Sequence, residues 1–248
     1  MRRLILYPLA VVVLLLLGPL YLLLSGQIDL HHSWQNSDRS SAQLAPDPAT
    51  TPEAVVQVYG ARAYNWRGAF AVHTWIATKD VDARDYVVHQ VLGWRQPHMR
   101  IGTAQPDRAW FGSKPVLLGE LRGPKAAEAI AHIFEAERRY PYNDVYRAWP
   151  GPNSNTFVAW VVREVPELTV ALPGNALGKD YLGESRFVAP APSDTGYQVS
   201  LWGVLGGTLA AHEGVELNLL GMVLGYNWYD HYLKLPGVGD IGRRSDAP

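Results

Sequence analysis

The sequence contains no cysteine among its 248 residues. It therefore cannot form disulfides, use a thiol as nucleophile, carry a lipid on cysteine or build a cysteine-based metal site. An excess of basic residues is also missing. When Arg2 and Arg3 are set aside, 20 basic and 23 acidic residues remain. A nucleic-acid binder needs a basic field, so we exclude nucleic acid as a partner.

Signatures of several enzyme classes are absent as well. There is no Gly-x-Ser-x-Gly elbow, Ser-x-x-Lys motif or Walker loop. The segment from His212 to Glu216 lacks the second histidine of a zincin helix. Gly237–Gly242 matches the dinucleotide-binding pattern, but too few residues follow for the helix that binds pyrophosphate. We expect neither a metal ion nor a cofactor.

Only one hydrophobic run is long enough to cross a membrane. Leu4 to Leu24 comprises 21 uncharged residues. At about 1.5 Å per residue such a helix spans about 31 Å, the thickness of a hydrocarbon core. Arg2 and Arg3 precede the run, and the next basic residue is Arg39. The positive-inside rule then places the N-terminus in the cytoplasm and the rest of the chain outside.

The alternative interpretation of this run is a cleaved signal peptide. Such a peptide has an apolar stretch of roughly 7–15 residues that ends in a small-residue cleavage site. The present run is longer and ends Leu-Leu-Leu-Ser-Gly-Gln. We therefore predict an uncleaved, single-pass anchor in the inner membrane, with the lipid bilayer as partner of residues 4–24 and a periplasmic or otherwise extracytoplasmic ectodomain.

Composition divides the chain into three parts. Residues 1–24 form a cytoplasmic stub and the transmembrane anchor. Residues 25–52 are polar, rich in serine and proline and without periodicity, which predicts a flexible tether. Residues 53–248 form one globular ectodomain, for which the hydrophobic fraction of 48% and the 27 aromatic residues provide an ample core.

The hydrophobic periodicity of the ectodomain predicts an α+β fold, an antiparallel sheet with a few packed helices. A helix is expected from Lys125 to Arg139 between Gly123-Pro124 and Pro141, and a second one after the turn at 149–152, ending at Pro166. Strands are expected at 54–59, 69–78, 86–92, 116–121, 196–207 and 215–223.

The second and third of these strands are predicted to form a hairpin, because Asp80-Val81-Asp82 between them is typical of a turn. If Val81 is the centre of the turn, His73 lies opposite His89. A register slip of one residue would abolish this pairing.

The segment Trp149-Pro-Gly-Pro-Asn-Ser-Asn-Thr-Phe157 contains the candidate catalytic centre. Its turn delivers Ser154 to the first turn of a helix, where free backbone N–H groups can stabilise an oxyanion. A serine nucleophile requires a base, for which His73 is the best candidate, with His89 orienting it. The candidate substrate-binding residues are Asn153, Asn155, Trp75 and Trp149.

These residues resemble two families. His73 on a strand, a polar group on the next strand and the Asn-Ser-Asn-Thr-Phe helix start resemble the circularly permuted NlpC-type papain-like domains, such as the PPPDE peptidases and lecithin retinol acyltransferase-like proteins. That likeness implies Ser154 at the position of their nucleophilic cysteine, His73 as base and His89 as third residue. Segments 71–77, 149–157 and 172–180 are also similar to a bacterial family, domain of unknown function 3750, which implies no activity.

Simpler roles for the same residues stand beside these. Serine and asparagine are preferred helix caps, so Ser154 can serve the helix start alone, and mid-strand histidines are often hydrogen-bonded core residues. Two functions remain open. One is a serine-dependent hydrolase or acyltransferase acting on an amide or ester of the cell envelope. The other is a catalytically inactive ectodomain that binds an envelope ligand or partner protein.

Overall fold

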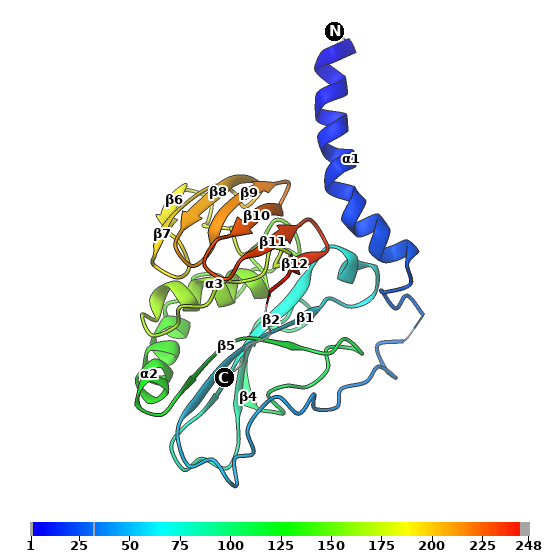
Figure 1. The fold of residues 1–248 in the computed structure, drawn as a ribbon. Helices are drawn as coiled ribbons and strands as arrows, with labels where there is room; N and C mark the ends of the chain where they lie inside the picture. The colour runs from blue at the N-terminus through cyan, green and yellow to red at the C-terminus, as the bar shows by residue number, and fades with distance from the viewer. Residues whose placement is uncertain (1, 32, 244–248) are drawn as a thin grey trace.

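The apolar run forms helix α1 (Arg2–Leu24), which projects from the rest of the chain (Figure 1). The structure is a computed structural model that describes residues 2–31 and 33–243, so the end of the predicted ectodomain, 244–248, lies outside the described residues. Over Leu6–Leu24 the helix is long and apolar enough to cross a membrane. It fits a single-pass membrane anchor, although a signal sequence would meet the same criteria.

A five-stranded antiparallel sheet forms the first layer of the domain, in the order β4-β3-β2-β1-β5. A short 3-10 helix, η1 (Asn65–Ala69), connects its first two strands. The strands are β1 (Val55–Arg62), β2 (Val72–Lys79), β3 (Val87–Val91), β4 (Met99–Thr103) and β5 (Val116–Arg122).

Two helices cover one face of this sheet. Helix α2 (Pro124–Arg138) begins with proline at its first position, and α3 (Ser154–Glu164) packs against β2 and α2. Alternation along β2 sends Ile76 into the core shared with these helices, whereas Trp75 and Ala77 enter a second core on the opposite face. The two faces of β2 therefore belong to different environments.

The second core is closed by loops instead of helices. Trp110 and Phe111 pack there together with Ala45, which comes from the segment after α1. The buried carboxylate of Asp107 accepts hydrogen bonds from the Ser41 hydroxyl and from two backbone N–H groups of the same segment. Part of the predicted tether thus lies against the sheet, while the division of the chain at residues 24 and 52 stays a prediction.

A seven-stranded antiparallel sheet forms the last layer, in the order β12-β11-β10-β9-β8-β7-β6. Figure 1 shows it over α3, which is enclosed between the two sheets. Each strand pairs with its neighbours in sequence. They are β6 (Val188–Pro190), β7 (Gly196–Leu201), β8 (Leu205–Ala210), β9 (Gly214–Leu219), β10 (Met222–Asn227), β11 (Tyr232–Leu235) and β12 (Gly239–Ile241).

The predicted α+β class, with an N-terminal apolar helix and antiparallel sheets, is confirmed, and both predicted ectodomain helices are present. The expected strands 196–207 and 215–223 are wrong, since each is a hairpin of two strands. Trp202-Gly203 and Leu220-Gly221 adopt positive φ at the turns. Apolar residues continue through both turns, so the pattern shows no break there.

The predicted register of the β2–β3 hairpin is also wrong. His89 pairs with Ile76, three residues from the expected partner His73. The connection runs from Asp80 to Tyr86 with Asp82 at positive φ, instead of turning tightly at Val81. Because three is an odd shift, the two histidines point to opposite faces of the sheet.

Candidate functional site

The start of α3 is held by a complete capping arrangement. The Asn153 side chain accepts hydrogen bonds from the backbone N–H groups of Asn155 and Thr156, at 2.9 and 3.2 Å. The Thr156 hydroxyl lies 3.1 Å from the Asn153 backbone N–H and accepts its hydrogen bond. Asn153 Nδ2 also donates to the carbonyl oxygens of Ala148 and Leu177. The amide of Asn153 is therefore fully used in structural bonds.

Asn155 joins α3 to β2. Its Oδ1 accepts a hydrogen bond from the Thr74 hydroxyl at 2.9 Å, and its Nδ2 donates to the carbonyl oxygens of Val72 and Leu177. Both N–H donors of this buried amide are engaged, as are those of Asn153. The two residues thus fix the helix to the sheet and to the loop after α3, and they present no free donor to a substrate.

His73 lies on the other face of β2. Its ring stacks on Trp110, with 3.7 Å between centroids, and its Nε2 lies 3.3 Å from Gln90 Oε1. Burial lowers the pKa of His73 to about 3, although the hydrogen bond to Gln90 opposes this shift. The imidazole is therefore neutral at pH 7 and is enclosed in an aromatic stack with Trp75.

The structure does not bring Ser154 and His73 together. Thr74 points to α3 and His73 points to the face with Trp110, so the sheet separates the two side chains. Among the described residues, no hydrogen bond joins Ser154 to a histidine. The two tryptophans predicted to bind substrate also make structural hydrogen bonds. Trp75 is buried and its indole N–H donates to the carbonyl oxygen of Pro106, and that of Trp149 donates to the carbonyl oxygen of Leu220.

His89 belongs to a third environment, beneath α2. Its Nε2 lies 2.8 Å from the Thr78 hydroxyl, and its Nδ1 lies 2.6 Å from Glu137 Oε1. This hydroxyl, imidazole and carboxylate chain has the order of a catalytic triad, but all three side chains are buried. The arrangement connects α2 to the hairpin and offers no surface at which a substrate could bind.

A cluster of buried charges connects the loop after α3 to the second sheet. Glu216 pairs with both Lys179 and Lys234, and Asp180 pairs with Lys179 at 2.9 Å. Burial alone would raise the pKa of Glu216, but the two ammonium groups outweigh it and lower that pKa to about 2. Burial would lower the pKa of Lys179, yet its two carboxylate neighbours raise it. These ions are paired and enclosed, so we assign them a structural role.

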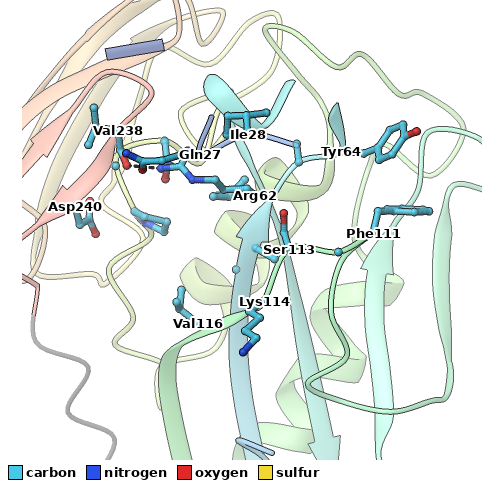
Figure 2. Close-up of a pocket in the computed structure, with 18 of the residues that line it drawn as sticks. Gln27, Ile28, Arg62, Tyr64, Phe111, Ser113, Lys114, Val116, Val238 and Asp240 are labelled. Carbon is cyan, nitrogen blue, oxygen red and sulfur yellow. Dashed lines mark hydrogen bonds between the residues drawn. The ribbon is translucent and has the colours of Figure 1, made fainter. Parts of the chain in front are cut away.

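A cavity of about 540 Å³ lies between the segment that follows α1, the first sheet and the end of the second sheet. Figure 2 shows Gln27 and Ile28, three and four residues beyond the end of α1, close to Arg62. Lys114 lies on the side away from them. Charged side chains of both signs line the cavity, namely Arg62, Lys114, Arg243, Asp29 and Asp240.

Arg62 has an unusual set of partners within this cavity. Its Nη1 donates to the carbonyl oxygens of Gly68 and Gly237, at 2.7 and 3.1 Å, and its Nη2 donates to that of Val238 at 2.9 Å. A guanidinium has five N–H donors, so two remain. Burial lowers the pKa of Arg62, but an arginine stays charged at neutral pH. Among the described residues no carboxylate forms an ion pair with it.

The other charges near the cavity leave it with a positive balance. Asp240 accepts hydrogen bonds from the backbone N–H of Gly174 and from Arg243, and is thereby neutralised. Asp29 accepts a hydrogen bond from the backbone N–H of His31. Three basic side chains and two carboxylates line the cavity, which leaves one positive charge in excess. A positive, partly enclosed site favours an anion.

The sequence predictions did not include this cavity, because its lining comes from segments that are far apart in the sequence. The sequence held one signal for the site. Arg62 is a charged residue at the end of the mostly apolar run Val-Val-Gln-Val-Tyr-Gly-Ala, whose residues are all buried in the strand. Within the described ranges, no group of three or more histidine, aspartate or glutamate side chains is placed to hold a metal ion.

Comparison with known proteins identifies a family. The sequence profile of the family described as protein of unknown function, DUF3750, matches residues 53–181, which is more than half of the chain. The match includes the first sheet, both helices and the loop with Lys179 and Asp180, and it ends before β6. No curated protein and no solved structure matches. The resemblance to permuted papain-like domains therefore stays a prediction.

Proposed function

We propose, from the premise that this chain belongs to the DUF3750 family of proteins of unknown function, that it is a membrane-anchored binding protein. Its ligand is an anionic constituent of the envelope, held in the cavity beside α1. The observation that carries this proposal is the Arg62 guanidinium, which lines the cavity and, among the described residues, uses three of its five N–H donors and forms no ion pair with a carboxylate.

The ligand group is of the phosphate or carboxylate type, because a guanidinium binds such groups through parallel N–H donors. The nearest source is the membrane itself. Gln27 and Ile28 line the cavity and follow the end of α1 at Leu24. If α1 crosses the bilayer, the cavity lies at the level of the lipid headgroups, so an anionic lipid headgroup is favoured over a free ion.

Binding is favoured over the hydrolase or acyltransferase because, within the described part of the chain, Ser154 forms no hydrogen bond with a base. The serine lies at the start of α3, and His73 lies on the opposite face of β2, neutral and stacked on Trp110. A serine hydroxyl depends entirely on a neighbouring base for its nucleophilicity. The proposal therefore assigns the Asn153–Asn155 segment to the architecture and the ligand to the cavity.

The binding test uses the detergent-purified full chain with dihexanoyl phosphatidic acid, dihexanoyl phosphatidylcholine and inorganic phosphate as probes, measured by calorimetry. We expect phosphatidic acid to bind better than phosphatidylcholine. Tight binding of inorganic phosphate alone would identify a free anion as the ligand, and equal binding of both lipids would contradict the anion site.

A matched pair of variants locates the site. Val116 lines the cavity and is 57% exposed, so Val116→Glu adds a negative charge to the cavity lining without disturbing the core. We expect the affinity for phosphatidic acid to fall roughly fivefold or more, since a like charge a few Å away costs about 1 kcal/mol even with the screening of water. Val145→Glu, also exposed but outside the cavity lining, serves as control. Equal affinities in the two variants would contradict the proposal.

The proposed topology puts the N-terminus in the cytoplasm and the domain outside, in the inner membrane. It is supported by Arg2 and Arg3 before the apolar helix and by the absence of further basic residues until Arg39. Alkaline phosphatase fused after Pro52 folds only outside the cytoplasm. We expect an active fusion of uncleaved size, and an inactive fusion would place the domain in the cytoplasm.

A further inference from the structure

The seven-stranded sheet has the reverse of the usual polarity. Its face toward α3 carries polar and charged side chains, among them Gln198, Glu216, Asn218 and Lys234, all buried. Every strand residue of this sheet that is exposed is apolar. A one-faced sheet in water normally places its apolar side chains inward and its polar ones outward.

The exposed apolar side chains form continuous rows across the strands. The strand register places the residues of each row directly opposite one another. The longest row crosses all seven strands and comprises Pro190, Tyr197, Leu209, Val215, Tyr226, Leu233 and Ile241. A second row comprises Val188, Val199, Leu217 and Leu224, with Gly207 between Val199 and Leu217. A third comprises the exposed Leu201 and Leu205 and the half-buried Leu219 and Met222.

This apolar face is large. Seven strands about 4.8 Å apart and up to six residues long at about 3.4 Å each give a flat area on the order of 600 Å². Soluble monomers rarely expose contiguous apolar patches beyond a few hundred Å². Leu209, near its centre, is 63% exposed. The face therefore requires a partner that is itself apolar and broad.

The contact with α1 indicates which partner this is. The turn between β11 and β12 touches α1 so closely that a Cβ on Gly18 would lie 2.1 Å from the Pro236 carbonyl oxygen. Likewise, a Cβ on Gly237 would lie 2.7 Å from a ring carbon of Pro19. Gly18 lies six residues before Leu24, the end of the candidate span. The sheet thus meets the helix about 9 Å inside that end, at about 1.5 Å per residue.

The direction of the face agrees with this depth. In Figure 1, α3 covers one face of the sheet, and α1 continues past the sheet on the side of the other face. A bilayer crossed by α1 would therefore lie over the apolar rows. Exposed aromatic residues lie in the turns of the sheet, at Trp202, Trp228 and Tyr229, and tryptophan and tyrosine favour the headgroup level.

We propose that the apolar face of the seven-stranded sheet lies in the outer leaflet of the membrane that α1 crosses, with phospholipid as its occupant. The inference rests on the proposed insertion of α1. The depth of about 9 Å matches the roughly 5–10 Å to which interfacial apolar surfaces enter a leaflet. The sheet edges suit this position, because β6 and β12 have only three residues each and leave few unpaired backbone groups.

The absence of cysteine makes a direct test possible. A single cysteine in the full chain carries a fluorophore, and the protein is reconstituted into phosphatidylcholine and phosphatidylglycerol vesicles that contain acyl-chain nitroxide lipid. The test position is Leu209→Cys, and Leu233→Cys in the same row repeats it. Val81→Cys, exposed in the β2–β3 connection, is the matched control outside the sheet. Leu14→Cys, in the middle of α1, reports on the anchor.

We expect nitroxide lipid to quench the probes at 209, 233 and 14 roughly twofold or more relative to the probe at 81, as for groups within the leaflet. Quenching at 14 but not at 209 or 233 would overturn this inference and leave the anchor intact. No quenching at 14 would refute the insertion of α1 and the inference together. Probes at 209 and 233 that are shielded from both nitroxide lipid and aqueous iodide would overturn it in favour of a protein partner, such as a second copy.

Discussion

At the scale of single residues, Glu216 shows how charge holds the second sheet in place. Its carboxylate is buried and bonds to the ammonium groups of Lys179 and Lys234. Replacing one member of such a group leaves an uncompensated charge in the interior. The charges therefore specify where the sheet lies, whereas apolar residues of equal volume would stabilise the contact without fixing its position.

Lys234→Met should lower the free energy of unfolding by about 3–5 kcal/mol, because it leaves the Glu216 charge only partly compensated. Urea denaturation of the detergent-solubilised chain measures the change. Lys125→Met, on the exposed face of α2, is the control and should alter stability by no more than about 0.5 kcal/mol. A small effect for Lys234→Met would show that the side chain is not buried as described.

His73 should make the protein less stable in acid. Its pKa in the folded state is lowered to about 3 by burial, whereas an unfolded histidine titrates near its ordinary value of 6.5. Its contribution is therefore complete above pH 6.5 and is lost as the pH falls toward 3. Between pH 7 and 4.5 the loss amounts to about 2–3 kcal/mol.

The variant His73→Phe keeps the stack on Trp110 but cannot titrate, so its stability should fall less over the same pH interval. His132→Phe is the control. Its exposed imidazole is paired with Glu167, which raises the pKa of His132, so that contribution is present in acid and lost as the pH rises. Equal pH dependence of the wild type and His73→Phe would show that water reaches His73 in the folded state.

At the scale of elements, the start of α3 is the best test of whether Ser154 has more than a structural role. Asn153→Ala removes the helix cap and two hydrogen bonds to neighbouring loops. We expect a loss of about 2 kcal/mol or more in the free energy of unfolding. Ser154→Ala removes a hydroxyl without a hydrogen-bond partner among the described residues and should cost under about 1 kcal/mol. A larger loss of unfolding free energy in Ser154→Ala than in Asn153→Ala would indicate that the serine hydroxyl forms a stabilising hydrogen bond.

Local signals in the sequence predicted the helices well, because their boundaries are set by neighbouring residues. Gly123-Pro124 begins α2 as expected, and of the serine and asparagine at the start of α3 it is Asn153 that caps the helix. The β2–β3 register could not be predicted, since it depends on a turn whose length the sequence does not mark. This register places His73 and His89 on opposite faces of the sheet, so the predicted pairing of the two histidines is wrong, while the catalytic role of Ser154 and His73 stays a prediction.

The sequence of β9 alternates between apolar and polar residues, but it does not tell which side of the strand faces the core. Val215, Leu217 and Leu219 alternate with Glu216 and Asn218, and alternation alone suggests that the apolar side faces the core. The structure has the opposite arrangement, because the polar side meets Lys179 and Asp180 from a distant loop. Residues that far apart in sequence are paired only by the fold.

At the scale of the whole molecule, the apolar face and α1 together should determine how much detergent the purified protein carries. Replacing Leu209, Leu217 and Leu224 by serine should release several bound detergent molecules, since the face becomes polar. Light scattering combined with refractive index and absorbance measures the bound mass. The control replaces Val81, Ile101 and Val145, which are exposed elsewhere, by serine. Equal detergent loss in both triple variants would contradict a specific apolar face.

Two attachments join the domain to its anchor, and together they restrict its motion. Asp107 holds residues 41–45 against the first sheet, and the turn from Pro236 to Val238 rests on α1 at Gly18 and Pro19. A domain fixed at two separated points cannot tumble on its stem. Any molecule that diffuses in the same membrane would then meet the domain at a constant height and with a constant tilt. Its search for the cavity beside α1 is a two-dimensional diffusion, and only the rotation of the domain about the membrane normal still has to match.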